Sequence, residues 1–236
     1  MNFDCYLFDL DNSLLYIPNP PEYFDNILKE TIEFFSENGL PPREQRNKFW
    51  LSGEQYKILL NEWGVILEDY NEFWEKFDAL DFEFRKLFVP KGKIRLFSDV
   101  LYVLNELMKV GKKLAIVSNT ARYIVDYIIR EFGLEDYFNE IFGLGYGNEQ
   151  DLAKPSPEGI KMILHKLDFD LEHSNALMIG DSIVDIIAAK RANIHACLLK
   201  RNFEKYPDGY SDWEHQPDFV IEDLEEILKL KPNYNF

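Results

Sequence analysis

The sequence predicts an α/β protein: a doubly wound parallel sheet with an all-helical segment inserted near the start of the chain. Three observations support this fold class. Short apolar runs without polar alternation recur along the chain, which is typical of strands buried on both faces of a parallel sheet. Amphipathic stretches with helix-start and helix-end signals lie between those runs. One long stretch, residues 17–89, contains no strand-like run.

The apolar runs define the expected strands and the stretches between them the expected helices. The predicted strands are residues 4–8, 113–117, 176–180, 195–199 and 218–221. The predicted helices of the sheet domain are residues 98–110, 121–132, 156–167, 183–192 and 222–230. Gly111 and Gly133 follow two of these helices, where glycine is favoured. This alternation indicates a doubly wound sheet.

The strand-free stretch predicts a separate helical domain. Three of the four Trp residues lie in it, and Gly39, Gly53 and Gly64 punctuate it. The predicted helices there are residues 21–38, 42–51, 53–63 and 67–87. We therefore expect one domain formed by residues 1–16 and 90–236, and a helical domain over residues 17–89.

Composition limits the partners of the protein. The chain has 26 Lys and Arg against 42 Asp and Glu, a formal net charge of −16. Nucleic acids and anionic membranes are held mainly by basic side chains, so we expect no nucleic-acid polymer and no membrane as partner. Cys5 and Cys197 lie in apolar runs, which predicts buried thiols in a reducing compartment. Asp4 precedes any basic segment, so we expect no secretory signal and a cytoplasmic protein.

The first predicted strand ends in Asp9-Leu10-Asp11. Ligands of open α/β sheets bind beyond the carboxyl ends of the strands, which places these acids well for chemistry. One carboxylate can act as a nucleophile, the second as general acid and base, and the pair can bind Mg²⁺. Alone, two acids at this spacing are more often a solvated acidic turn.

Three further segments carry polar residues at or near predicted strand ends. Ser118 and Asn119 open the next helix, and could bind an anion or cap the helix. Lys154 lies in a proline-rich turn and could neutralise a phosphoryl group or be a surface lysine. Asp181 could complete a Mg²⁺ site, while Asp185, four residues on, could brace the lysine or a metal-bound water. Alternatively, both acids could stabilise the helix N-terminus.

The joint occurrence of these residues favours function. Nucleophile, hydroxyl, cation and metal-binding acid follow one another in the order Asp9, Ser118, Lys154, Asp181, and their coincidence is improbable. The histidines show no metal-ligand spacing. The glycine-rich segment 143–147 lacks the helix that a dinucleotide site requires, and is predicted to be a loop.

Over nearly its whole length the sequence resembles the haloacid dehalogenase (HAD) superfamily of hydrolases. It is similar in particular to the phosphatases with a helical C1-type cap inserted after the first motif, such as phosphoglycolate phosphatase and β-phosphoglucomutase. The resemblance implies a Rossmann-like core and Mg²⁺-dependent hydrolysis of a small phosphomonoester. It further implies that Asp9 attacks phosphorus, while Asp11 protonates the leaving alcohol and then activates water. Mg²⁺ would be held by Asp9, the main-chain carbonyl of Asp11, and Asp181.

The same resemblance implies that Ser118 and Lys154 hold the phosphoryl oxygens, together with amides near Asn119, and that Asp185 lies behind the metal and the lysine. The segment from residue 51 to 55 resembles the substrate-specificity loop of such caps, which makes Ser52 and Gly53 candidate specificity residues.

Asn12-Ser13 stands where the family often has Gly-Thr, and Asn tolerates the left-handed conformation. The presence of Asp11 favours phosphate esters over carbon–halogen bonds. Three alternatives stay open: a phosphosugar mutase, a nucleoside 5′-monophosphatase, and a non-catalytic phospholigand-binding protein. The expected partner is a small phosphorylated metabolite, and the expected oligomeric state is a monomer or homodimer.

Overall fold

The computed structural model describes residues 3–50, 52, 55–145, 148–170, 174–201, 205–206 and 209–231. The chain forms two compact units, here called the sheet unit and the helical unit. The sheet unit comprises Met1–Tyr16, Leu96–Leu144 and Leu152–Phe236, and the helical unit comprises Ile17–Arg95 and Gly145–Asp151. The domain boundaries inferred from the sequence stay a prediction.

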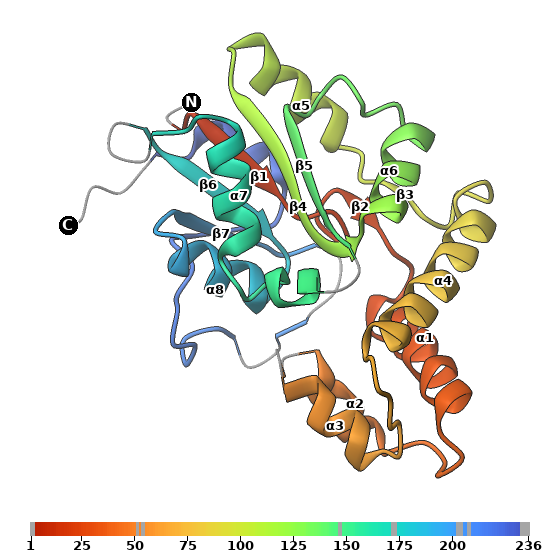
Figure 1. Cartoon of the computed structure of the whole chain (residues 1–236). Coiled ribbons are helices and arrows are strands. Elements are labelled where there is room, and N and C mark those ends of the chain that lie inside the picture. The colour runs from red at the N-terminus through yellow and green to blue at the C-terminus, as the bar shows by residue number, and fades with distance from the viewer. Residues whose placement is uncertain are drawn as a thin grey trace. The chain divides into compact units, whose positions relative to one another are not determined.

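A six-stranded parallel sheet forms the centre of the sheet unit (Figure 1). Its strands are β1 (Cys5–Phe8), β4 (Lys113–Ala121), β5 (Glu140–Leu144), β6 (Ala176–Gly180), β7 (His195–Leu199) and β8 (Phe219–Ile221). Their order is β5-β4-β1-β6-β7-β8, so β1 lies between β4 and β6. The predicted α/β fold class is confirmed, and the five predicted strands are all present.

Helices cover both faces of this sheet. They are α5 (Val100–Lys109), α6 (Arg122–Glu131), α7 (Glu158–Lys166) and α8 (Ile183–Arg191). Successive strand residues point to opposite faces, and Cys5 and Leu7 of β1 share one apolar core with α7 and α8. The helix α6 packs on β4 and β5, and α5 packs on the 3₁₀ helix η3 (Leu224–Lys229). Both cysteines are buried and free, as predicted.

Three local predictions need correction. The strand β5 was not predicted; Gly143 and Leu144 belong to it rather than to a loop, while residues 146–147 lie outside the described residues. A Cβ on Gly143 would lie 2.9 Å from Arg122 Cα, so glycine allows β5 to approach α6 closely. The segment predicted as a helix over residues 222–230 is the 3₁₀ helix η3. The strand β4 runs to Ala121, so Ser118 and Asn119 lie in an irregular extension of the strand and not in the first turn of α6.

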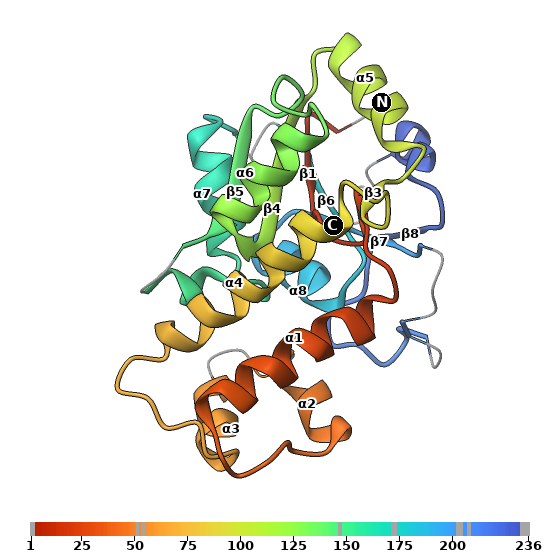
Figure 2. The same cartoon turned by 90° about the vertical axis from the view of Figure 1, so that its right-hand side faces the viewer.

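The helical unit contains α1 (Pro20–Phe35), α2 (Arg43–Phe49), α3 (Tyr56–Glu62) and α4 (Asn71–Phe88), close to the predicted helices. The helices α1 and α4 lie side by side (Figure 2). Aromatic rings pack the interior: the Phe49 ring centroid lies 5.5 Å from that of Trp74, which lies 5.3 Å from that of Tyr56. These aromatic side chains therefore build the core of their own unit.

Charged groups are also buried in the helical unit. Arg46 donates to both carboxylate oxygens of Asp25 at 2.7 and 2.8 Å. On α4, the fully buried Arg85 donates to Asp81, which also accepts from the Tyr23 hydroxyl at 2.6 Å. Each buried carboxylate named here therefore has a basic partner.

Two short strands, β2 (Leu15–Tyr16) and β3 (Arg95–Leu96), pair with each other. They stand where the chain passes between the two units. In the part of the chain that the structure describes, no helix combines the length and the apolarity needed to cross a bilayer.

Candidate active site

Asp9 stands at the carboxyl edge of the sheet, directly after β1. Its amide donates to the Ile179 carbonyl at 2.8 Å, so pairing with β6 continues to this residue and fixes its backbone. The chain then turns at Asn12, whose φ of 59° is in the left-handed region that Asn was expected to tolerate. The Asn12 amide closes the turn on the Leu15 carbonyl at 2.7 Å. Asp9 is buried, with 8% of its surface exposed.

Lys154 joins two of the predicted acids. Its Nζ donates to Asp9 Oδ1 and Asp185 Oδ1, both at 2.6 Å, and to the Val117 carbonyl at 2.8 Å. These bonds use the three hydrogens of the ammonium group. Asn119 fixes the loop, because its side chain accepts from the Lys154 amide at 2.8 Å and donates to the Lys154 carbonyl at 2.9 Å. The Asn119 side chain therefore positions the lysine.

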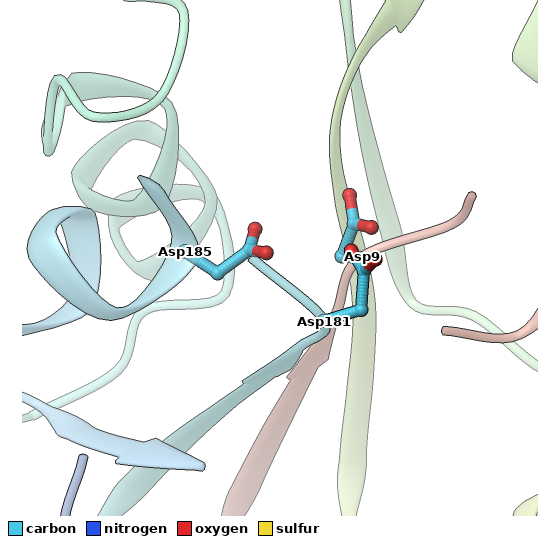
Figure 3. A group of neighbouring side chains, drawn as sticks. All are labelled: Asp9, Asp181 and Asp185. Atoms are coloured by element: carbon cyan, nitrogen blue, oxygen red, sulfur yellow. The ribbon is translucent and has the colours of Figure 1, made fainter. Parts of the chain in front are cut away.

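Asp181 follows β6, and Asp185 lies on the first turn of α8 (Figure 3). The second oxygen of Asp185 accepts from the Ser182 amide at 3.0 Å. Asp185 also packs on Gly180, where an added Cβ would lie 2.2 Å from its Cγ. Asp181 Oδ2 accepts from Lys205 Nζ at 3.1 Å.

These acids fit a divalent metal of the hard class. Asp9, Asp181 and Asp185 each offer an oxygen, and the three oxygens lie within 4.8 Å of one another. Carboxylate oxygens without nitrogen or sulfur donors suit Mg²⁺. Both oxygens of Asp185 already accept hydrogen bonds of 3.0 Å or less, whereas Asp9 and Asp181 each bind one ammonium through a single oxygen, and the second oxygen of Asp9 accepts only a long bond from the Ser13 hydroxyl at 3.4 Å. Asp9 and Asp181 are therefore the better ligands.

Burial and charge act against each other in this cluster. Burial raises the pKa of Asp9, Asp181 and Asp185 above the usual range, while the neighbouring ammonium groups oppose that rise. Burial alone would lower the pKa of Lys154, but the carboxylates of Asp185 and Asp9 outweigh it and hold that pKa above its usual value. Lys154 therefore stays charged, and its positive charge favours the ionised form of Asp9.

Asp11 is held by a residue that the sequence analysis did not single out. The Thr120 hydroxyl donates to Asp11 Oδ2 at 2.8 Å. The Thr120 amide donates to Ser118 Oγ at 3.1 Å, which leaves the hydroxyl hydrogen of Ser118 to be donated elsewhere. Ser118 is buried and directly follows Val117, the residue whose carbonyl binds Lys154. The extension of β4 thus brings Thr120 and Ser118 to the site.

Arg201, which follows β7, was also missed. Its guanidinium donates to the Ser13 carbonyl at 2.7 and 3.2 Å and to Asp99 Oδ2 at 2.6 Å, and it stacks 4.0 Å from the Phe97 ring centroid. Burial would raise the pKa of Asp99, but the Arg201 guanidinium outweighs it and holds that pKa below its usual value. Arg201 therefore fixes the turn that follows Asp11.

The predicted specificity residues do not belong to the sheet unit. Ser52 belongs to the helical unit, where its hydroxyl donates to the Phe49 carbonyl at 2.7 Å. Gly53 lies outside the described residues. The structure thus brings together the predicted residues of the sheet unit and leaves the roles of Ser52 and Gly53 as predictions.

A parallel sheet with a buried cluster of acids and a lysine beyond its carboxyl edge is the arrangement expected of a hydrolase of the HAD class. The chain belongs to the haloacid dehalogenase-like hydrolase family, whose model matches residues 6–199. The resemblance inferred from the four motifs is confirmed, and the protein is an enzyme.

Two curated relatives and one solved structure illustrate the likeness. The chain is 30% identical to Pyrophosphatase PpaX of Oceanobacillus iheyensis over 98% of this chain and 97% of the relative. It is 31% identical to Phosphoglycolate phosphatase of Vibrio vulnificus over 57% of this chain and 56% of the relative. A HAD-superfamily hydrolase of subfamily IA from Geobacter sulfurreducens has the same fold, with a TM-score of 0.57, 20% identity, and coverage of 98% and 97%.

Proposed function

We propose that this hydrolase is a Mg²⁺-dependent phosphatase that cleaves a small phosphomonoester through a phosphoryl group transiently bound to Asp9. The observation that carries the proposal is the buried contact of Asp9 Oδ1 with Lys154 Nζ at 2.6 Å, with Asp181 close by at the same sheet edge. A buried carboxylate paired with a fixed cation is a nucleophile beside a group that can neutralise a phosphoryl oxygen.

Asp9 would attack phosphorus and form the acyl phosphate while the bond from phosphorus to the leaving oxygen breaks. Asp11 would give its proton to that leaving oxygen. In the second step Asp11 would take a proton from water, whose oxygen attacks phosphorus and frees the Asp9 carboxylate. The Thr120 hydroxyl orients Asp11 for both transfers.

Ser118 would donate its hydroxyl hydrogen to a phosphoryl oxygen, and Lys154 would neutralise another. Asp185 would hold Lys154 in place. Mg²⁺ would be held by Asp9, Asp181 and the main-chain carbonyl of Asp11, and would supply positive charge for the phosphoryl group in the transition state.

We propose further that residues 1–16 and 90–236 form the hydrolase domain and that residues 17–89 form the cap found in the resembling phosphatases. The enzyme is expected to work in the cytoplasm, because both of its cysteines are unpaired.

The names of the relatives direct the choice of substrates. Phosphoglycolate is the first candidate, because several relatives are named phosphoglycolate phosphatase. Pyrophosphate is the second, because one of the relatives that match nearly the whole chain is named a pyrophosphatase. Sugar phosphates and nucleoside 5′-monophosphates test the remaining phosphatase alternatives.

The test measures phosphate release from this panel with Mg²⁺ and with chelator, for wild type and for Asp9→Asn. We expect metal-dependent release that the substitution abolishes, and a phosphoryl group on the Asp9 peptide by mass spectrometry after acid quenching. If Asp9→Asn, in a preparation free of host phosphatases, releases phosphate at the wild-type rate, Asp9 is not the nucleophile. Isomerised sugar phosphate with little free phosphate would instead indicate a mutase.

A further inference from the structure

Lys205 brings a second ammonium group to the acid cluster from the segment between β7 and β8. Its Nζ donates to Asp181 Oδ2 at 3.1 Å. The next residue anchors this segment, because the Tyr206 hydroxyl accepts from the Ile183 amide at 2.8 Å, in the first turn of α8. The Tyr206 ring also packs edge-on against Trp213, with 4.6 Å between centroids. The contacts of Tyr206 therefore position Lys205 beside Asp181.

The two ammonium groups of the cluster differ in how firmly they are held. Lys154 makes three hydrogen bonds, and its side chain is 3% exposed. Among the described residues, Lys205 makes one hydrogen bond to the cluster, to Asp181, and its side chain is 35% exposed. Displacing Lys205 into water therefore breaks one ion pair, whereas displacing Lys154 would break two.

Lys205 binds an acid that a metal would also use. Of the three clustered carboxylates, Asp185 has both oxygens engaged, whereas Asp9 has Oδ1 engaged by Lys154 and accepts only a long hydrogen bond, 3.4 Å from the Ser13 hydroxyl, at Oδ2. A divalent cation is thus left with Asp181 and the second oxygen of Asp9. Three carboxylates facing two ammonium groups carry one excess negative charge, and the arrival of a divalent cation beside Lys205 brings like charges together.

We propose that Lys205 is a resident counter-cation of Asp181 that competes with the divalent metal, so that its displacement sets the metal affinity of the site. Without metal, Lys205 neutralises Asp181 and limits repulsion among the three buried carboxylates. When metal binds, the flexible stem of Lys205 lets its ammonium move into water. This inference rests on the proposed metal site.

Calorimetric titration with Mg²⁺ tests the competition directly. Lys205→Met removes the charge and keeps the stem, Lys205→Arg keeps a charge, and Lys200→Met removes a charge from an exposed neighbour in the same segment. We expect Lys205→Met to bind Mg²⁺ roughly tenfold more tightly than wild type, the gain of removing a partly exposed ion pair. Lys205→Arg should bind Mg²⁺ with an affinity within a few-fold of that of wild type. Lys200→Met should have the Mg²⁺ affinity of wild type.

The metal-free proteins give a second measurement that does not depend on activity. We expect Lys205→Met to melt at a lower temperature than wild type without Mg²⁺ and to show the larger upward shift when Mg²⁺ is added. Equal or weaker Mg²⁺ binding by Lys205→Met would overturn the inference and assign Lys205 to orienting Asp181. If wild type binds no Mg²⁺, or if Asp181→Asn binds it equally well, the proposed metal site itself fails.

Discussion

Asp78 on α4 is a buried carboxyl group whose neutralisation should stabilise the protein. It is 7% exposed, and no hydrogen bond to its side chain is present among the described residues. Burial raises the pKa of Asp78 to about 8, Asp81 adds to the rise, and Arg85 opposes it. Asp78→Asn replaces the carboxyl with a neutral group of nearly the same shape.

The pKa shift of Asp78 determines both the magnitude and the sign of the stability difference expected between Asp78→Asn and wild type. The pKa of Asp78 rises from 3.8 to about 8, and each pKa unit corresponds to ~1.4 kcal/mol, which gives an upper limit of about 6 kcal/mol. The folded state holds the proton more tightly, so this contribution to stability is complete below pH 4 and is lost as the pH rises to about 8. Asn cannot ionise, so the variant avoids the loss. Its advantage should be near zero at pH 4 and greatest above pH 8.

Urea unfolding followed by tryptophan fluorescence measures this difference, because three of the four Trp residues lie in the helical unit. Comparing Asp78→Asn with wild type at each pH cancels the titration of the other buried acids. The matched control is Glu75→Gln, at an exposed position of the same helix, which should change stability by less than about 0.5 kcal/mol at every pH. An Asp78→Asn difference that does not grow with pH would refute the reasoning.

Three further changes test the sheet unit. Thr120→Val removes the hydrogen bond to Asp11 and should lower kcat roughly tenfold or more, the cost of a hydrogen bond to a charged group. Gly180→Ala should lower the melting temperature and cut kcat on the order of a hundredfold, because its Cβ would meet Asp185 Cγ at 2.2 Å. Asp99→Asn should cost about 3 kcal/mol in urea unfolding at pH 7 by breaking a buried ion pair. That cost should shrink as the pH falls below 4, because a carboxyl with a lowered pKa stabilises the fold above its unfolded pKa and loses the effect as it is protonated.

Thr120→Val and Gly180→Ala each have a control variant, and each of the three changes has a result that would contradict it. Thr120→Ser keeps the hydroxyl and should keep most of the activity, whereas an unchanged kcat in Thr120→Val would show that the hydrogen bond is dispensable. Gly111→Ala, before the first residue of β4, adds a Cβ into open space at a φ of 70°, so as a control it should lower the melting temperature and leave kcat unchanged. Full activity of Gly180→Ala would contradict the packing argument. A stability difference for Asp99→Asn that is the same at pH 3 and pH 7 would contradict the assigned pKa direction.

Local pattern explains why much of the fold was predictable. The strands β1, β6 and β7 are buried on both faces, so their sequences are continuous apolar runs, and parallel pairing places their ends together. From that rule, Asp9 and Asp181 could be predicted to lie at the same edge of the sheet, while the order that makes β1 and β6 adjacent comes from the structure. The strand β5 escaped prediction because it opens with Glu140 and contains Gly143, two residues that strands disfavour. Its place is set by pairing with β4 and by the close approach of α6.

The residues that the sequence did not disclose reach the site through long-range contacts. Thr120 binds an acid 109 positions away, and Arg201 binds the carbonyl of Ser13, 188 positions away. No helical or strand period relates such pairs, so an exposed and an engaged basic side chain of a loop look alike in sequence. The sequence likewise does not show which of the predicted acids is available to a metal. Strand-end logic gathers Asp181 and Asp185, yet only the bonds to Lys205, Lys154 and the Ser182 amide distinguish a carboxylate available to a metal from one already fully engaged.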